Sequence, residues 1–338
     1  MAAILVASLL PPSAARAADT APLVRLTVEL NDGSRVVGTS VDKNLKFHSA
    51  SLGDLKLAVK DIRSVERATS NTVTVATTAG DTLSLSLATS KIAVLTSFGK
   101  VELPADSIHG FRVAVINANA AQRTGLISLW PGEGNGMDVI GGNNGSLPSD
   151  VGYSPGVVNR AFDFPGHATI NIPDRPSLNP VNGLTIEFWI YVRPKADYKW
   201  SQNVIGKDGD CNGQREYKLG VGDSPNQTGT GDFRAHIGVP GGFLALDSVT
   251  VVQSNTWYHV AETWDGATMK LYVNGKLDGE LAAPGPLTVT AEPVRLGGGT
   301  TGCYSEYCFD GLLDEPALYD HALSAEEIQA DYAAGNKN

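Results

Sequence analysis

The stretch WYHVAETWDGATMKLYVNG, from Trp257 to Gly275, decides the fold of the second half of the chain. Aromatic and β-branched residues fill Trp257 to Trp264, and Asp265-Gly266 then ends the run, which indicates a strand followed by a turn. From Met269 to Val273 apolar residues alternate with polar ones, so this segment is expected to be a strand with one apolar face. Asn274-Gly275 tolerates positive φ and predicts a tight hairpin turn into a further strand. The stretch therefore predicts an antiparallel meander.

Four further segments carry a pattern of their own in the same part of the chain. They are GLISLWPGEGNGMDVIGGNNGSL (Gly125 to Leu147), AFDFPGHATINIP (Ala161 to Pro173), SLNPVNGLTIEFWIYVRP (Ser177 to Pro194) and FDGLLDEPALYDHALSAEEI (Phe309 to Ile328). Together with the meander they resemble, in order, the LamG-like jelly-roll family of laminin G-like, pentraxin-like and concanavalin A-type sandwiches. The resemblance implies an all-β, antiparallel jelly-roll sandwich over residues 125–335. It implies less about function, because this fold carries many unrelated activities.

An internal repeat organises the first part of the chain. LGDLKLAVKDIRSV (Leu52 to Val65) aligns with FGKVELPADSIHGF (Phe98 to Phe111), and each copy follows a strand, turn and strand pattern. Two such units predict a smaller repeat-built β domain over residues 18–115, a pseudo-symmetric sandwich or barrel whose halves cover each other's apolar faces. Residues 116–124 are polar and lack periodicity, so they are interpreted as a linker.

Composition and the first residues bear on location and partners. The net charge is −10 and no cluster of Lys or Arg occurs, so a nucleic-acid partner is not expected. A short apolar run from Ile4 to Leu10 precedes Ala15-Arg16-Ala17, which predicts a signal peptide over residues 1–17. No other segment reaches the roughly 18 apolar residues of a membrane span. The chain is therefore expected to be secreted, or to lie in the periplasm or cell envelope.

Calcium is the cofactor that the resemblance implies. In such sandwiches a calcium ion commonly ties the opening loop to the last strand, and the matching positions are Asp138, Asn143 and Asp314. Carboxylate and amide oxygens on irregular loops suit this ion. The alternative is that Asp138 and Asn143 only cap turns while Asp314 accepts hydrogen bonds from backbone amides.

A second oxygen-rich loop does not depend on the family. Asp208, Asp210 and Asn212 stand in DGDCNG, which matches the first half of an EF-hand loop. The twelfth position is Leu219 instead of Glu, so Glu216 is the local candidate for the missing carboxylate. A plain polar turn is the alternative interpretation.

Ligand recognition is predicted for four aromatic residues in segments otherwise poor in apolar side chains. Exposed rings can stack on sugar faces while polar groups bond hydroxyls. The candidates are Tyr198, Trp200, Tyr304 and Tyr307. The alternative is that these rings pack beneath their own loops.

Three cysteines in an exported chain invite a disulfide. Cys303 and Cys308 bracket the segment that holds two of the candidate rings, and a bridge there would staple a loop with little core of its own. Cys211 could instead pair with either of them, or all three could be reduced.

Near the C-terminus two local features are expected. Pro316 cannot donate to a ladder, so its strand is expected to be an edge strand or to carry a bulge. Ser324 and Glu327 form a capping-box pattern that predicts a short helix ending at Gly335.

Catalysis is not expected, since retaining glycoside hydrolysis needs two carboxylates about 5 Å apart. The nearest candidates are Glu187 and the adjacent Asp314 and Glu315, whose side chains should point in opposite directions on a strand. His259 is expected to be structural. The sequence therefore predicts an exported, non-catalytic binding or adhesion protein that recognises a carbohydrate or an extracellular protein. A glycoside hydrolase or lyase and a structural envelope component are the alternatives.

Overall fold

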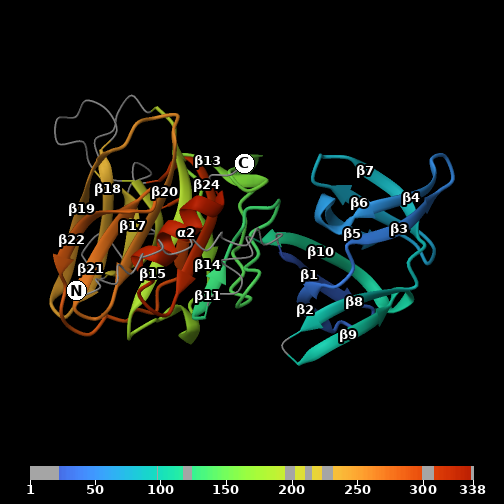
Figure 1. Cartoon of the computed structure of the whole chain (residues 1–338), viewed down its shortest axis with the longest axis horizontal. Helices are drawn as coiled ribbons and strands as arrows, with labels where there is room; N and C mark the ends of the chain where they lie inside the picture. The colour runs from blue at the N-terminus through green and yellow to red at the C-terminus, as the bar shows by residue number, and fades with distance from the viewer. Residues whose placement is uncertain are drawn as a thin grey trace, which may run out of the picture.

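The computed structural model describes residues 23–96, 98–116, 124–194, 202–209, 215–222, 231–298 and 308–335. Over these residues the protein is all-β with one helix, as the sequence predicts, and Figure 1 shows a smaller N-terminal domain beside a larger sandwich. The proposed leader, residues 1–17, lies outside the described residues. Within the described part, no helix is long and apolar enough to span a membrane.

The N-terminal domain is one curled sheet of ten strands in the order β4-β3-β7-β6-β5-β10-β1-β2-β8-β9. Its strands are β1 (Leu23–Leu30), β2 (Arg35–Ser40), β3 (Asn44–Ser49), β4 (Gly53–Ala58), β5 (Ile62–Arg67), β6 (Val73–Thr77), β7 (Thr82–Leu87), β8 (Lys91–Thr96), β9 (Gly99–Pro104) and β10 (Ile108–Ile116). Single 3-10 turns, η1 (Val59–Asp61) and η2 (Ala105–Ser107), precede β5 and β10.

The repeat explains this strand order. Strands β1 to β5 belong to the first copy and β6 to β10 to the second, because the start of β5 at Ile62 corresponds to the start of β10 at Ile108. Half of the sheet combines β3, β4 and β5 of the first copy with β6 and β7 of the second. The other half combines β8, β9 and β10 of the second copy with β1 and β2 of the first. The two copies therefore exchange strands, and their apolar side chains form one shared core that includes Leu26, Phe47 and Phe111.

The jelly roll consists of two antiparallel sheets around a second core. One sheet has the order β12-β13-β24-β15-β20-β21-β22, with β11 also paired to β24, and the other has the order β14-β23-β16-β17-β18-β19. The strands of the first sheet are β11 (Leu126–Leu129), β12 (Gly152–Pro155), β13 (Arg160–Pro165), β15 (Leu184–Val192), β20 (Trp257–Trp264), β21 (Thr268–Val273), β22 (Lys276–Ala282) and β24 (Asp310–Tyr319). The strands of the second sheet are β14 (Ile170–Ile172), β16 (Gln202–Asp208), β17 (Arg215–Val221), β18 (Asp232–Val239), β19 (Gly242–Val251) and β23 (Val294–Leu296).

The predicted meander is present as β20, β21 and β22. Asn274 and Gly275 have φ of 50° and 74° and form the two-residue turn in which Val273 pairs with Lys276. Met269, Leu271 and Val273 lie in the core between the sheets, as their alternation predicts. Tyr272, on the opposite face, was expected to be on a polar face but is buried, because a helix covers that face.

That helix is α2 (Ala325–Gly335), drawn in red across the first sheet in Figure 1. The capping box that opens it is confirmed: the Ser324 amide donates to Glu327 Oε2 at 2.8 Å, and the Glu327 amide donates to Ser324 Oγ at 3.2 Å. A small apolar cluster that includes Ile328, Leu323 and Tyr272 holds the helix against the sheet.

Strand β24 lies inside the first sheet, so it is not an edge strand and the alternative of a bulge holds. Glu187 pairs with Ala317 but Trp189 pairs with Asp314, so the two residues Glu315 and Pro316 lie opposite the single residue Phe188. Glu315 adopts φ of 52°, a conformation that costs a residue with a side chain roughly 1–2 kcal/mol. Bulges of this kind re-aim side chains and are frequent beside functional sites.

Candidate functional site

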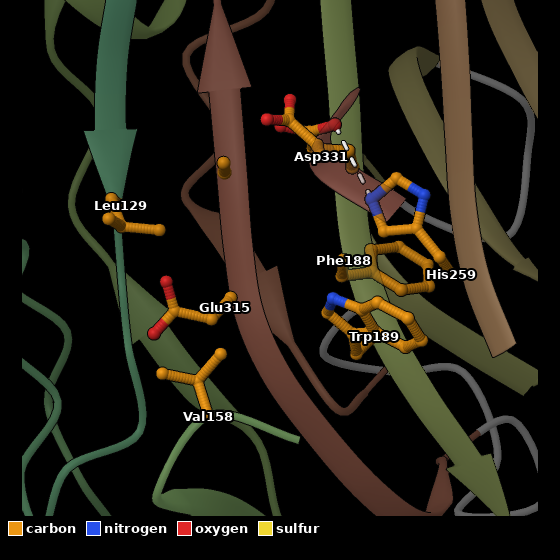
Figure 2. A pocket seen from close by; sticks show the side chains of 9 residues that line it. Leu129, Val158, Phe188, Trp189, His259, Glu315 and Asp331 are labelled. Carbon is orange, nitrogen blue, oxygen red and sulfur yellow. Dashed lines mark ion pairs between the residues drawn. The ribbon is translucent and has the colours of Figure 1, made fainter. Parts of the chain in front are cut away.

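A small acidic cavity lies between α2 and the outer face of the first sheet. It has a volume of about 30 Å³, and its lining includes Glu187 of β15, His259 of β20, Glu315 of β24 and Asp331 of α2. Figure 2 draws these side chains together with Trp189 and Leu129. All four polar residues are at least nine-tenths buried. The cavity can therefore hold one water molecule or a small ion, whereas pockets for drug-sized ligands measure about 300–1,000 Å³.

Glu187 and His259 form the centre of this site. Glu187 Oε1 accepts a hydrogen bond from the Tyr319 hydroxyl at 2.7 Å, and its Oε2 lies 3.5 Å from His259 Nε2. The dashed line in Figure 2 marks this ion pair. The His259 ring packs against Trp189 with centroids 5.2 Å apart, and Trp189 stacks on Tyr332 of α2 at 5.7 Å. These contacts fix the imidazole beneath the helix, which agrees with a structural role for His259.

The bulge in β24 brings two acidic side chains to Val158. Strand alternation predicts that Asp314 and Glu315 point in opposite directions, and this expectation is wrong because the left-handed backbone at Glu315 interrupts the alternation. Asp314 Oδ2 accepts a hydrogen bond from the Val158 amide at 2.8 Å, and Glu315 lines the cavity together with Val158. Asp314 Oδ1 and Glu315 Oε1 are buried without a hydrogen-bond partner. Burial, with added repulsion from neighbouring carboxylates, raises the pKa of both groups well above their usual range.

Glu133 is a third member of this group, and sequence reasoning missed it. It lies in the opening loop and is 6% exposed, and its Oε1 accepts a hydrogen bond from the Arg160 amide at 3.3 Å. Burial raises the pKa of Glu133 to about 7, and its charge in turn raises the pKa of both Asp314 and Glu315. The signal that could have found it is its place between two glycines, Gly132 and Gly134, in a loop otherwise poor in charge.

The three carboxyl groups of Glu133, Asp314 and Glu315 can be tested against the needs of a calcium ion. Their donors are hard oxygens, and two of the oxygen atoms are buried without partners, which suits a hard cation. None of the three takes part in an ion pair among the described residues. The described residues also contain no three His, Cys, Asp or Glu side chains that converge on one metal position. An ion here would thus take part of its ligands from backbone carbonyls.

The opening-loop candidates Asp138 and Asn143 are placed differently. Asp138 accepts hydrogen bonds from the amides of Leu129, Ile140, Gly141 and Asn143 at 2.8 to 3.2 Å. The Asn143 amide group donates to Ser128 Oγ at 2.8 Å. These contacts match the alternative in which both residues cap turns, and neither residue shares a partner with Asp314 among the described hydrogen bonds. Glu133, not Asp138, is the opening-loop acid that faces the last strand.

The second oxygen-rich loop is only partly described. Asp208 is buried at the end of β16, its backbone carbonyl accepts a hydrogen bond from Arg295 at 2.7 Å, and burial raises the pKa of its carboxyl group. Asp210 and Asn212 lie outside the described residues. Glu216 cannot complete a calcium loop there, because its carboxylate is buried 2.8 Å from Lys207 Nζ. Calcium binding at Asp208 stays a prediction.

The four candidate rings Tyr198, Trp200, Tyr304 and Tyr307 also lie outside the described residues, as do Cys211 and Cys303. The ring-bearing segments, 195–201 and 299–307, nevertheless rejoin the sandwich at neighbouring residues. Asn203, at the start of β16, forms a parallel bridge with Cys308, and the Asp310 amide donates to Gln202 Oε1 at 3.1 Å. The predicted bridge between Cys303 and Cys308 stays a prediction.

Comparison with known proteins places the sandwich in a family. Residues 164–329 match the model of the concanavalin A-like lectin/glucanases superfamily described as Laminin_G_3. The LamG-like resemblance is therefore confirmed for this part of the chain. No curated protein matches the chain.

Several solved structures are similar to part of this chain. The binding domain of Paraclostridial Mosquitocidal Protein 1 aligns with a TM-score of 0.51 at 16% identity, covering 62% of this chain and 52% of that one. Domain 4 of AbnA, an extracellular GH43 arabinanase from Geobacillus stearothermophilus in complex with arabinotriose, aligns at 0.49 and 19% identity, covering 62% and 98%. The binding domain of botulinum neurotoxin serotype G aligns at 0.47 and 13% identity, covering 63% and 51%. At 16% identity, the likeness to the first of these structures supports the β-sandwich fold and establishes no activity.

Proposed function

We propose that this chain is an exported, non-catalytic binding protein whose jelly roll recognises a carbohydrate or an extracellular protein, with a calcium ion that stabilises the sandwich. The binding surface would include the rings of Tyr198, Trp200, Tyr304 and Tyr307. Export would follow from the leader at residues 1–17.

The proposal rests on one observation: the two ring-bearing segments rejoin the sandwich at residues that are neighbours in space. All four rings belong to segments that rejoin the sandwich at Asn203 and Cys308, which are bridged neighbours. Loops supported by a rigid scaffold are the usual carriers of binding residues, and residues that follow the two segments are neighbours on one scaffold. This arrangement supports one recognition surface instead of scattered aromatic residues.

The enclosed state of the acidic residues argues against glycoside hydrolysis at this cavity. Hydrolysis of a glycosidic bond needs two carboxyl groups on either side of a sugar. Glu187 and Glu315 line a cavity of about 30 Å³ that α2 covers, and a sugar ring does not fit there. A cavity of this size supports a structural role for the acids.

Calcium would be held by Glu133 and Asp314, with Glu315 beside them. When bound, the ion would supply positive charge that offsets the repulsion among these buried carboxylates. Glu133 lies in the opening loop and Asp314 in the last strand, so their shared ligand would join the two ends of the jelly roll. Without an ion, the same groups can share protons, which agrees with their raised pKa values.

A glycan and protein array probed with the purified full chain, with calcium and with a chelator, tests the proposed function. We expect binding that is lost in Trp200→Ala and Tyr304→Ala. Phe243→Ala is the matched control, because Phe243 is a ring on β19 with 40% of its surface exposed. Retained binding in both loop variants would contradict the ring surface, and release of reducing sugar from any array glycan would contradict the non-catalytic assignment.

Thermal unfolding with added calcium tests the ion separately. An ion present at about 100 times its Kd stabilises the folded state by about 2.7 kcal/mol, which corresponds to a rise of about 5–10 °C in the Tm of a domain this size. We expect this rise in the wild-type chain and in Glu280→Gln, whose carboxyl group is exposed on β22. Glu133→Gln and Asp314→Asn should lose it. An equal rise in all four proteins would place the ion elsewhere.

A further inference from the structure

Two arginines of the N-terminal domain, Arg63 of β5 and Arg112 of β10, contact the jelly roll, and a third, Arg25 of β1, interacts with it electrostatically. Arg112 Nη1 lies 3.5 Å from Met137 Sδ, and the Arg63 side chain lies so close to Gly134 that its Cδ would be 3.0 Å from a Cβ there. Arg25 is partly buried, and the negative charge of Asp138 in the opening loop of the jelly roll favours its charged form. In Figure 1, β10 ends toward the sandwich.

All of these contacts fall on one short loop, residues 132–138, and this loop also carries Glu133. One side of the loop faces the arginines of the N-terminal domain. On the other side Glu133 faces the jelly roll, where its Oε1 accepts the hydrogen bond from the Arg160 amide. A loop held between two bodies has fewer conformations than one supported from a single side.

From these contacts we infer that the N-terminal domain braces the opening loop of the jelly roll and so positions Glu133, with the Arg63 stem as the principal contact. This inference rests on the proposed role of Glu133 as a calcium ligand. It assigns the N-terminal domain a function in the acidic site of its neighbour.

Backbone conformation makes such a brace necessary. Gly132 and Gly134 flank Glu133 with φ of 76° and 84°, a region that glycine enters freely. Glycine loses more conformational freedom on folding than any other residue, so the loop tends to move unless it is packed. The Arg63 stem covers Gly134 where that residue has no side chain of its own. Packing from the N-terminal domain therefore replaces the contacts that a side chain would have made.

The stem of Arg63 matters here and its charge does not. The charge of Arg63 acts on Tyr153, whereas the pKa of Glu133 is raised by burial and lowered by Arg160 and Asn159. A methionine at position 63 keeps an unbranched stem without charge, whereas an alanine removes the stem. The two substitutions therefore separate packing from electrostatics.

Hydrogen exchange of the full chain, measured by mass spectrometry on peptides that cover residues 131–140, tests the brace. We expect the double variant Arg63→Ala and Arg112→Ala to exchange roughly ten times faster in this segment, because local opening is opposed by fewer contacts. Arg63→Met should exchange like the wild type. Arg35→Ala, at an exposed arginine of β2, is the matched control and should change nothing.

Calcium titration of the same four proteins gives the second readout. The double alanine variant should bind calcium several-fold more weakly, with the other two variants at the wild-type value. Unchanged exchange in the double variant would overturn the brace, as would equal loss in Arg63→Met. A wild-type chain that binds no calcium would refute the calcium proposal alone, because the exchange comparison still decides whether the loop is braced.

Discussion

Glu262 gives the sharpest test of the energetics of this sandwich. It is fully buried on β20, opposite Ile186 of β15 and Leu271 of β21, and both neighbours belong to the core between the sheets. Residues directly opposite on neighbouring strands share a face, so the Glu262 carboxyl group points into apolar surroundings. Neither of its oxygens has a hydrogen-bond partner. Burial raises its pKa well above the usual value.

Replacing Glu262 with methionine keeps an unbranched chain and removes the polar group. A buried polar group without a partner costs about 1–3 kcal/mol, so Glu262→Met should stabilise the jelly roll by about 2 kcal/mol. For a domain of this size that corresponds to a rise in Tm of about 4–8 °C. All five tryptophans follow residue 129, so tryptophan fluorescence reports the unfolding of the jelly roll alone.

The stability gained by Glu262→Met should increase with pH. A carboxyl group ionises near pH 4.3 in the unfolded chain and at higher pH in the folded one. Below pH 4 both states carry the proton and no charge is buried. As the pH rises above this value the unfolded state ionises first, so the wild type loses stability while Glu262→Met does not. The difference in Tm between the two proteins should therefore widen from pH 4 to pH 8.

The control for this prediction is Glu280→Gln, in which an exposed carboxyl group on β22 is neutralised and no change is expected. A Glu262→Met variant that is less stable than the wild type at every pH would refute the reasoning. A gain that stays constant between pH 4 and pH 8 would show that the carboxyl group has the same pKa in the folded and unfolded states, and would refute the proposed cause.

Three further substitutions test other parts of the jelly roll by urea unfolding followed through tryptophan fluorescence. Lys207→Met leaves the buried carboxylate of Glu216 without its partner at 2.8 Å, and should cost about 3–5 kcal/mol; a loss below 1 kcal/mol would mean that Glu216 is protonated. Ser324→Ala removes the hydroxyl half of the capping box and should cost about 1 kcal/mol, whereas Ser324→Asp should retain most of the stability. Asn274→Ala loses the hydrogen bond to the His259 amide at 3.0 Å and keeps φ of 50°, so it should cost about 1–2 kcal/mol, and Asn274→Gly should cost less.

The sequence predicts the parts of the fold that depend on local pattern. The meander, its Asn274-Gly275 turn and the capping box at Ser324 each need only a few neighbouring residues, and each is present as predicted. The bulge at Pro316 was also foreseen as one of two alternatives, because proline lacks the amide that a ladder requires. Periodicity could not show that α2 would cover Tyr272, since that depends on where the helix docks.

The candidate site was predicted less completely, because it depends on contacts between distant segments. Asp138 matches a family position, but its carboxylate is occupied by backbone amides of its own loop. The part that Glu133 plays in the site depends on the packing of the opening loop beside β24, which are far apart in the sequence. The direction of Glu315 depends on a backbone twist that the alternation rule excludes. Such features follow from tertiary packing, which propensity and spacing do not encode.

The strand exchange in the N-terminal domain has a consequence for chain integrity. Each half of that sheet takes strands from both repeats, so a backbone cut in the turn between β5 and β6 would leave two fragments that still share one core. The fragments would remain bound through the pairing of β3 with β7, β2 with β8, and β1 and β5 with β10. Proteolysis at that turn would thus nick the domain without releasing the jelly roll from the first repeat. A single repeat, by the same geometry, could complete its sheet only with a second copy of itself.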